Sequence, residues 1–353
     1  MSSIFDGREV YKPYDFPEVE KNFTEPVQDG YWVHRELEFD KDVQNYKTDL
    51  TETDRQIISR ILRTFSEVEV HVADDLWSKI GRFLPRPEFC EMGYTFAENE
   101  SRHASAYFRI NEVLNLKEFE PYSKDPILSD KFENLINSSL NFDFDKTNPE
   151  HIKRFAFGLA VFSAFTERVA LFGQFMILKS FSSNGRNFMK TVGNVIDWSK
   201  REESLHGDGG IYIFNKIKDE CNWIWTNEFK SSIYVAFTTG MDIETKLIKD
   251  IFDGNNLPNL TSDQVINYMK NRANDSLKKL GLKAIFDIDE KVLEDTKWFD
   301  LESNATQFTD FLAGSRPTDY AKNMVVFDES TVKVSENFLT KLDKNYIIDG
   351  RMD

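Results

Sequence analysis

Two long stretches of this 353-residue chain contain no proline, which favours long helices. The chain has 10 prolines, with none between Pro26 and Pro85 and none between Pro149 and Pro258. Proline breaks helix interiors, whereas folds of many short strands are rich in proline-containing turns. Because 40% of the residues are hydrophobic, the chain can also bury a large core. We therefore predict an all-α fold.

The net charge argues against nucleic acids and anionic membranes as partners. There are 44 Lys and Arg against 60 Asp and Glu, a formal charge of -16, so phosphate surfaces would repel the chain. The longest uninterrupted apolar run, 155–165, has 11 residues, too few to cross a bilayer. Cys90 and Cys221 lack the spacing of a disulfide scaffold, and the first residues lack a signal-peptide pattern. We expect free thiols and a cytoplasmic protein.

Hydrophobic periodicity and turn signals predict seven helices. They are expected at 51–80, 87–116, 128–140, 151–180, 186–217, 222–252 and 262–281. Either Thr51 or Thr53 would cap the first helix, and either Thr261 or Ser262 the last. Residues 182–185 form a turn signal between the two most apolar helices.

The two ends of the chain lack clear amphipathic order. We expect residues 1–30 to be an extended N-terminal arm, 31–321 the folded domain and 322–353 a flexible C-terminal tail.

Two of the five histidines follow a glutamate by three residues, in the pairs Glu100–His103 and Glu203–His206. On a helix this spacing puts a carboxylate and an imidazole on one face, where both can bind one metal ion. One such pair has little weight, because glutamate is common in this chain. Two pairs on two apolar helices are harder to dismiss, since burying these groups without a cation costs several kcal/mol. They indicate a shared dinuclear metal site of the kind built in four-helix bundles.

Such a site needs two further glutamates, one on the helix before each pair. Glu167 interrupts the apolar segment FAFGLAVFSAFTERVALFGQFMILKSF, and the alternative is a surface glutamate paired with Arg168. Glu69 is less distinct, because Glu67, His71 and two aspartates lie close by. From the residues alone, Glu69 and its neighbours remain equal candidates.

Tyr107 lies one helical turn beyond His103, on the same face. It would come close to such a site. An ordinary core tyrosine with a hydrogen-bonded hydroxyl is the alternative.

Together these motifs resemble the small subunit of class I ribonucleotide reductase. The resemblance extends from about Tyr31 to Lys322. It rests on ESRHASAY at Glu100–Tyr107 and REESLH at Arg201–His206. YWVHRELEFDKD, INYMKNRANDSLKKLGL and TDFLAGSRPTDYAK support it.

The resemblance implies a ferritin-like bundle, usually a homodimer, with a dinuclear metal site in its four core helices. An oxygen species activates this site, and the resulting radical is delivered to a large catalytic subunit that reduces ribonucleotides to deoxyribonucleotides. The implied enzyme is a ribonucleoside-diphosphate reductase. Matched position by position, the implied metal ligands are Glu69, Glu100, His103, Glu167, Glu203 and His206.

Further roles are implied only by the resemblance. Tyr107 matches the radical-bearing tyrosine of many members, Trp32 the electron relay beside the site, and Glu36 a polar residue at the subunit interface. Tyr346 in the tail would be the last step toward the catalytic subunit.

Two positions depart from many members of the family, which carry aspartate where Glu69 and Glu202 stand. Glu202 would still pair with the relay tryptophan. The longer side chain of Glu69 leaves the identity of the two metal ions open. Two iron ions are favoured, with manganese–iron or two manganese ions as alternatives. The oxidant could be stored on Tyr107 or on the metals.

Two other functions fit a buried metal site in a helical bundle. One is a ferritin-like oxidase or hydroxylase acting on a small organic substrate. The other is a metal-storage or structural bundle. The tail and the Trp32 relay favour the reductase subunit over both.

Overall fold

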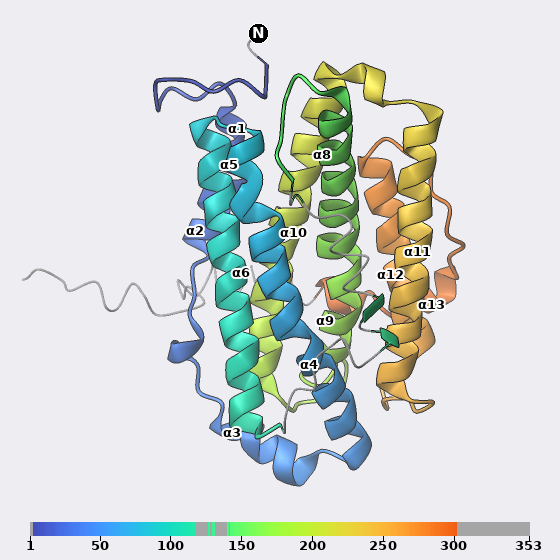
Figure 1. The fold of residues 1–353 in the computed structure, drawn as a ribbon. Helices are drawn as coiled ribbons and strands as arrows, with labels where there is room; N and C mark the ends of the chain where they lie inside the picture. The colour runs from blue at the N-terminus through green and yellow to red at the C-terminus, as the bar shows by residue number, and fades with distance from the viewer. Residues whose placement is uncertain (1–2, 117–125, 128, 131–139, 141, 302–353) are drawn as a thin grey trace, which may run out of the picture.

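The protein is an all-α bundle, as predicted (Figure 1). The computed structural model describes residues 3–116, 126–127, 129–130, 140 and 142–301. The side chains of residues 63, 64, 66–71 and 75 fall outside this description, as do the expected tail and most of the expected helix at 128–140. Within the described ranges, the extended pairing is a single isolated bridge between Leu257 and Leu260.

Long helices lying side by side form the core, and further helices, some long and some short, flank it. The core helices are α4 (Glu52–Asp75), α6 (Pro87–Leu114), α8 (Pro149–Val161) continued by α9 (Leu171–Lys179), and α10 (Lys190–Glu220). The flanking helices are α1 (Pro17–Val19), α2 (Glu25–Asp29), α3 (Asp40–Gln44), α5 (Ile80–Phe83), α11 (Asn227–Phe252), α12 (Ser262–Lys279) and α13 (Glu290–Glu294).

Local sequence signals set several helix ends. Thr51 and Thr261 each form a capping box, with Asp54 and Gln264 respectively. Thr226 caps α11, so that helix begins at Asn227, and residues 222–224 form a separate 3-10 turn. Helix α11 ends at Phe252, because Asp253 and Gly254 both adopt left-handed backbone conformations.

Helix α10 begins four residues later than the predicted start at residue 186. Its first-turn N–H groups are bonded by side chains from distant segments, which local sequence does not reveal. The Val192 amide donates to Asp42 Oδ2 at 2.8 Å, and the Met189 amide donates to Asn45 Oδ1 at 3.3 Å. Residues 186–189 instead form a connection in which Arg186 pairs with Asp54 at 2.9 Å.

The N-terminal arm is not extended throughout, so that prediction was wrong for Pro17–Asp29. These residues form α1, a π-helical segment (Glu20–Thr24) and α2 without a break. Val19, Phe23 and Val27 recur at a spacing of four, and all are buried. Burial of this apolar stripe stabilises the helix. The π turn lies directly before Pro26, which has no N–H to donate to a helical hydrogen bond.

The first residues of the arm are fastened to the body by polar contacts. The Ile4 amide donates to Glu220 Oε2 at the end of α10, at 2.8 Å. The Arg86 guanidinium donates to the Ser3 carbonyl at 2.7 Å and pairs with Asp15. Ile4 and Phe5 are buried beneath these contacts.

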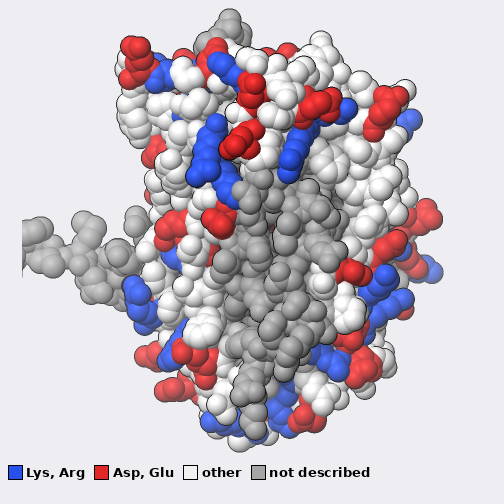
Figure 2. Space-filling model, in the orientation of Figure 1, with Lys and Arg blue, Asp and Glu red and all other residues white. Residues whose placement is uncertain are grey.

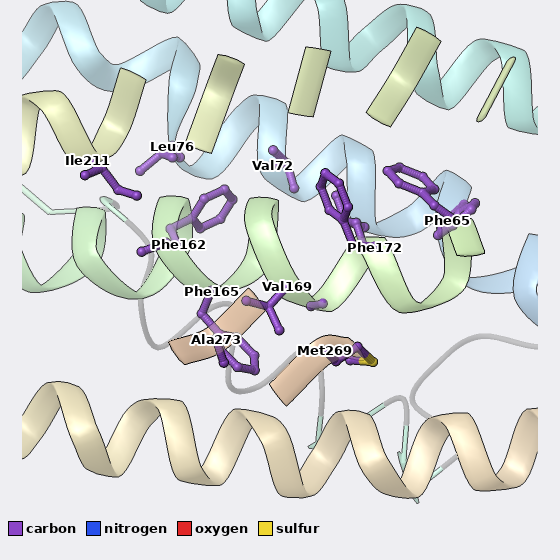
Figure 3. Close-up of a cluster of buried hydrophobic side chains, with 14 of the residues drawn as sticks. Phe65, Val72, Leu76, Phe162, Phe165, Val169, Phe172, Ile211, Met269 and Ala273 are labelled. Carbon is purple, nitrogen blue, oxygen red and sulfur yellow. The ribbon is translucent and has the colours of Figure 1, made fainter. Parts of the chain in front are cut away.

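Between α8 and α9 the chain widens into a nine-residue π-helix, Phe162–Ala170, every residue of which is buried. Phe162 and Phe172 point toward α4, while Phe165 and Val169 point toward α12 (Figure 3). Glycines on neighbouring helices make room for the extra width: a Cβ at Gly210 would collide with Ser163, one at Gly207 with Arg168, and one at Gly240 with Phe165.

The continuous helical stretch Pro149–Lys179 has the length and mean hydropathy needed to cross a membrane. Counting only the 11-residue apolar run underestimated it. In the fold, 94% of its most apolar window is buried inside the protein, so this stretch forms part of the core. Acidic and basic side chains are interspersed over the described part of the face in Figure 2.

Gly210→Ala should lower the free energy of unfolding, because the new methyl group overpacks the contact with Ser163 at a cost of about 1–3 kcal/mol. This loss should exceed the gain of about 1 kcal/mol that alanine brings within a helix. Urea unfolding followed by circular dichroism measures the difference. Gly7→Ala is the control, since a Cβ there lies 3.6 Å from Pro85 Cγ, an ordinary contact. A Gly210→Ala protein as stable as the unsubstituted one would contradict the prediction.

Candidate metal centre

Three helical segments bring four acidic and imidazole side chains together in the core. Glu100 comes from α6, Glu167 from the π-helix, and Glu203 and His206 from α10. One ligand atom from each lies within 4.8 Å of all the others, and all four side chains are fully buried. The cluster thus contains both glutamates of the expected Glu–His pairs but only one of their histidines, and His103 lies beside it, 2.9 Å from Glu203 Oε1.

The two glutamates of these pairs lie between the two imidazoles. Glu100 Oε1 is 2.6 Å from His206 Nδ1, and Glu100 Oε2 is 3.3 Å from His103 Nδ1. Glu203 Oε1 is 2.9 Å from His103 Nδ1, and Glu203 Oε2 is 3.3 Å from His206 Nδ1. Each carboxylate therefore faces both imidazoles, the placement that a ligand bridging two ions requires.

Although these atoms lie close together, they do not form hydrogen bonds with one another. Among the described residues, both oxygens of Glu100 and of Glu203, Glu167 Oε2, and the Nδ1 atoms of both histidines have no partner in hydrogen-bonding geometry. Buried polar atoms without partners are costly. Carboxylate oxygens and imidazole nitrogens are ligands for iron, manganese and zinc. The donor set therefore fits one or more cations.

The acidic groups and imidazoles shift one another's protonation. Burial lowers the pKa of His206, but the negative charges of Glu100 and Glu203 outweigh burial and raise that pKa to about 9. Burial alone would raise the pKa of Glu203, yet the nearby imidazoles of His103 and His206 hold that pKa well below its usual range. For Glu167, burial and then the charges of Glu203 and Glu100 raise the pKa well above normal.

Glu167 does not point to the surface, so the alternative of a surface pair with Arg168 is wrong. Its Oε1 accepts a hydrogen bond from Trp77 Nε1 at 2.8 Å. Arg168 instead pairs with Asp208 at 2.5 Å and with Asp275 at 3.0 Å. Adjacent residues of the π-helix thus face opposite ways, one into the site and one toward α10 and α12.

A chain of hydrogen bonds leads away from His103 on the other side. Its Nε2 lies 2.7 Å from Glu202 Oε2, which also accepts a bond from Trp32 Nε1 at 2.9 Å. Trp32 is fully buried and its carbonyl accepts from Arg102 at 3.0 Å. Although burial opposes it, His103 lowers the pKa of Glu202. The longer glutamate at position 202 therefore reaches both the tryptophan and the histidine.

Tyr107 is fully buried on α6, and its ring centre lies 6.4 Å from that of His103 and 4.7 Å from that of Phe65. It thus lies beside the site, within a wall of aromatic side chains. Glu36 is exposed in a 3-10 turn, His34–Glu36.

Two predicted site residues fall outside what the structure describes. Glu69 belongs to α4, but its side chain lies outside the described part. Tyr346 lies beyond the last described residue, Leu301. Trp77 was not among the predicted site residues, because no motif marks a tryptophan that follows a helix.

Comparison with known proteins adds independent information. The family described as ribonucleotide reductase, small chain, matches residues 8–292. The probable ribonucleoside-diphosphate reductase small subunit 376L of Invertebrate iridescent virus 6 is 28% identical over 349 residues, covering 90% of this chain and 95% of that protein. The ribonucleoside-diphosphate reductase subunit beta of Chlamydia pneumoniae is 26% identical, covering 72% of this chain and 75% of that protein.

The fold is shared with solved structures. The ribonucleotide reductase R2 subunit from Clostridium botulinum superposes with a TM-score of 0.69 at 16% sequence identity. The match covers 82% of this chain and 89% of that chain. The expected ferritin-like fold class is therefore confirmed.

In metal-free protein, His206 should titrate near pH 9, because Glu100 and Glu203 favour its charged form. Since this folded pKa lies above the ordinary value of about 6.5, the stabilisation from protonated His206 is complete below about pH 6.5 and lost as the pH rises through about 9. NMR of labelled imidazole carbons resolves this, as the chain has five histidines. His34 is the internal control: burial and then Arg35 and Arg109 lower its pKa. A His206 midpoint near 6.5 would show that the carboxylates carry no charge.

Proposed function

This chain belongs to the ribonucleotide reductase small-chain family, and we propose that its buried glutamates and histidines hold the dinuclear metal centre at which members of the family generate their radical. The single observation that carries this assignment is that Glu100 and Glu203 each face both imidazoles within 3.3 Å. A protein of this family is the small subunit of a class I ribonucleotide reductase, active together with a large catalytic subunit.

We assign the ligands as follows. Glu100 and Glu203 would bridge the two ions, His103 would bind one, and His206 with Glu167 the other. Glu69, assigned by its place in the family motif, would complete the first ion's ligands. The proximity of Glu167 to His206 within one cluster supports its place at the second ion. The four carboxylates of this set would also supply the negative charge that two divalent ions require.

Two iron ions are the favoured occupants, with manganese–iron or two manganese ions as alternatives. A set of carboxylates with one imidazole for each ion suits all three pairs, since these metals accept mixed oxygen and nitrogen ligands. Bound ions would supply the electrons that reduce an oxygen species.

The chain's own residues would protect and transmit the oxidising equivalent. Phe162, Phe165, Leu171, Phe172 and Phe175 are buried around the π-helix and exclude water and stray reductants. Tyr107 would hold the radical, and the 6.4 Å between its ring centre and that of His103 supports this role. Glu202 joins Trp32 to His103 through hydrogen bonds, so the relay would begin at this carboxylate.

The finer partner and location assignments are also proposals. The chain would divide into an arm at 1–30, a folded domain at 31–321 and a tail at 322–353. The tail, which contains Tyr346, would bind the large catalytic subunit. Ribonucleoside diphosphates are the substrates named for the relatives, and we propose them here, in the cytoplasm, without nucleic-acid or membrane partners.

We further propose a homodimer. Tyr94 and Phe108 on α6 are 62% and 51% exposed, and their spacing of 14 residues places them on one face of that helix. A second copy of the chain would cover this face, with Glu36 at its edge.

Glu203→Ala should abolish binding of both ions, because Glu203 faces both imidazoles, whereas Glu167→Ala should leave about one ion per chain. Metal analysis after anaerobic loading with Fe(II) measures the stoichiometry. Glu112→Ala, on the surface of the same helix as Glu100, should keep two ions. Full occupancy of Glu203→Ala would overturn the ligand assignment.

Tyr107→Phe should eliminate a tyrosyl radical signal that forms when the iron-loaded protein meets oxygen. Electron paramagnetic resonance at low temperature detects this signal. Tyr268→Phe is the matched control, because Tyr268 is also buried and its hydroxyl donates to Asp300 at 2.9 Å. A metal-coupled signal that survives in Tyr107→Phe would place the oxidant on the metals instead.

A further inference from the structure

Trp77 enters the core through a break in the helical path. Helix α4 ends at Asp75, and Leu76 leaves the helical region with φ -123° and ψ -73°. Trp77 then starts a 3-10 turn, Trp77–Lys79, and its side chain is fully buried. The break turns the indole inward, so that its N–H donates to Glu167 Oε1 at 2.8 Å.

This hydrogen bond involves only one of the two carboxylate oxygens of Glu167. Oε1 is occupied by the indole, while Oε2 makes no hydrogen bond within the described part of the chain. Indole is only a donor, so it can neither bind a metal ion nor remove a proton. Trp77 therefore restrains one oxygen and leaves the other available.

The indole has little freedom to move. A Cβ at Gly93 would lie 2.8 Å from the Trp77 carbonyl oxygen, so α6 passes very close to its backbone. A Cβ at Gly210 would lie 3.4 Å from the indole ring itself. Phe96 presents its ring edge-on at 4.8 Å between centres, with an angle of 89° between the planes. These contacts from α6 and α10 hold the donor in one place.

We propose that Trp77 is a positioning residue that makes Glu167 a one-oxygen ligand of the second metal ion. The inference rests on the proposed function, since it needs metal at Glu167. A carboxylate can bind through one oxygen or through both, and the choice changes the coordination number of the ion. For Glu167 to use both oxygens, Oε1 would have to bind the ion while it also accepts the indole N–H, which draws electron density away from the metal. The indole thus sets the coordination number of one ion only.

Replacing the indole tests this inference directly. In Trp77→Phe the N–H is lost, so Glu167 can take the ion with both oxygens. Near-infrared magnetic circular dichroism of the Fe(II)-loaded protein reports the coordination number of each ion. We expect one of the two ions to change its bands and the other to keep them. Loss of a hydrogen bond to a metal ligand also typically weakens metal binding about 10- to 100-fold, and here only the second ion should be affected.

Two further proteins separate positioning from simple packing. Benzothienylalanine at position 77 keeps the shape of the bicyclic ring but replaces the N–H with sulfur, and it should reproduce the Trp77→Phe spectrum without a cavity. This variant decides the matter if Trp77→Phe fails to fold. Trp225→Phe removes another indole, one that packs on Phe214 and Phe229, and it should leave both ions unchanged.

The outcomes distinguish this inference from the proposed function. If the unsubstituted protein does not bind two ions, the dinuclear assignment fails, and the inference fails with it. Suppose instead that the unsubstituted protein binds two ions and that the benzothienylalanine variant has the same spectrum and metal affinities as the unsubstituted protein. Trp77 then only fills space, and this inference alone is overturned.

Discussion

The structure depends on burying a concentrated set of charges at the centre of an apolar bundle. Glu100, Glu167, Glu203, His103 and His206 are all fully buried, and acids cannot be removed from water at this density without opposite charge or protons. In the metal-free protein the imidazoles hold part of that positive charge, as the raised pKa of His206 indicates. Bound cations would take over this role, so metal loading and imidazole deprotonation are coupled.

The π-helix is the main local adaptation to that demand. Widening the helix over Phe162–Ala170 points Glu167 into the site while Arg168 reaches Asp208 and Asp275. π-Helical segments often mark functional sites, where the altered helical phase redirects a side chain. Here the widening is possible because Gly207 and Gly210 on α10 remove the side chains that would collide with it. Helix α10 thus carries two proposed ligands, Glu203 and His206. Its glycines also leave the space that the π-helix needs to present a third, Glu167.

The sequence was informative wherever the controlling interaction is local. Thr51 and Thr261 each cap a helix through a residue only three positions later in the chain. The shared face of each Glu–His pair follows from the helical repeat. Prediction failed where distant partners decide. Helix α10 begins at Lys190 because Asp42, 150 residues away from Val192, bonds its first turn. Nothing near Trp77 signals that its indole reaches Glu167, 90 residues further along. The role of Glu69 stays a prediction from the family motif.

The fastening of the N-terminal arm has a consequence for the order of assembly during synthesis. Ile4 bonds to Glu220, a residue made 216 positions later. At about 5–20 residues per second, a ribosome needs roughly 10 to 40 s to make that partner. Until then Ile4 and Phe5 have no α10 terminus to pack beside. Because α10 also carries Glu203 and His206, the arm closes on the bundle only after the last predicted ligands exist, and its docking marks completion of the proposed metal-binding core.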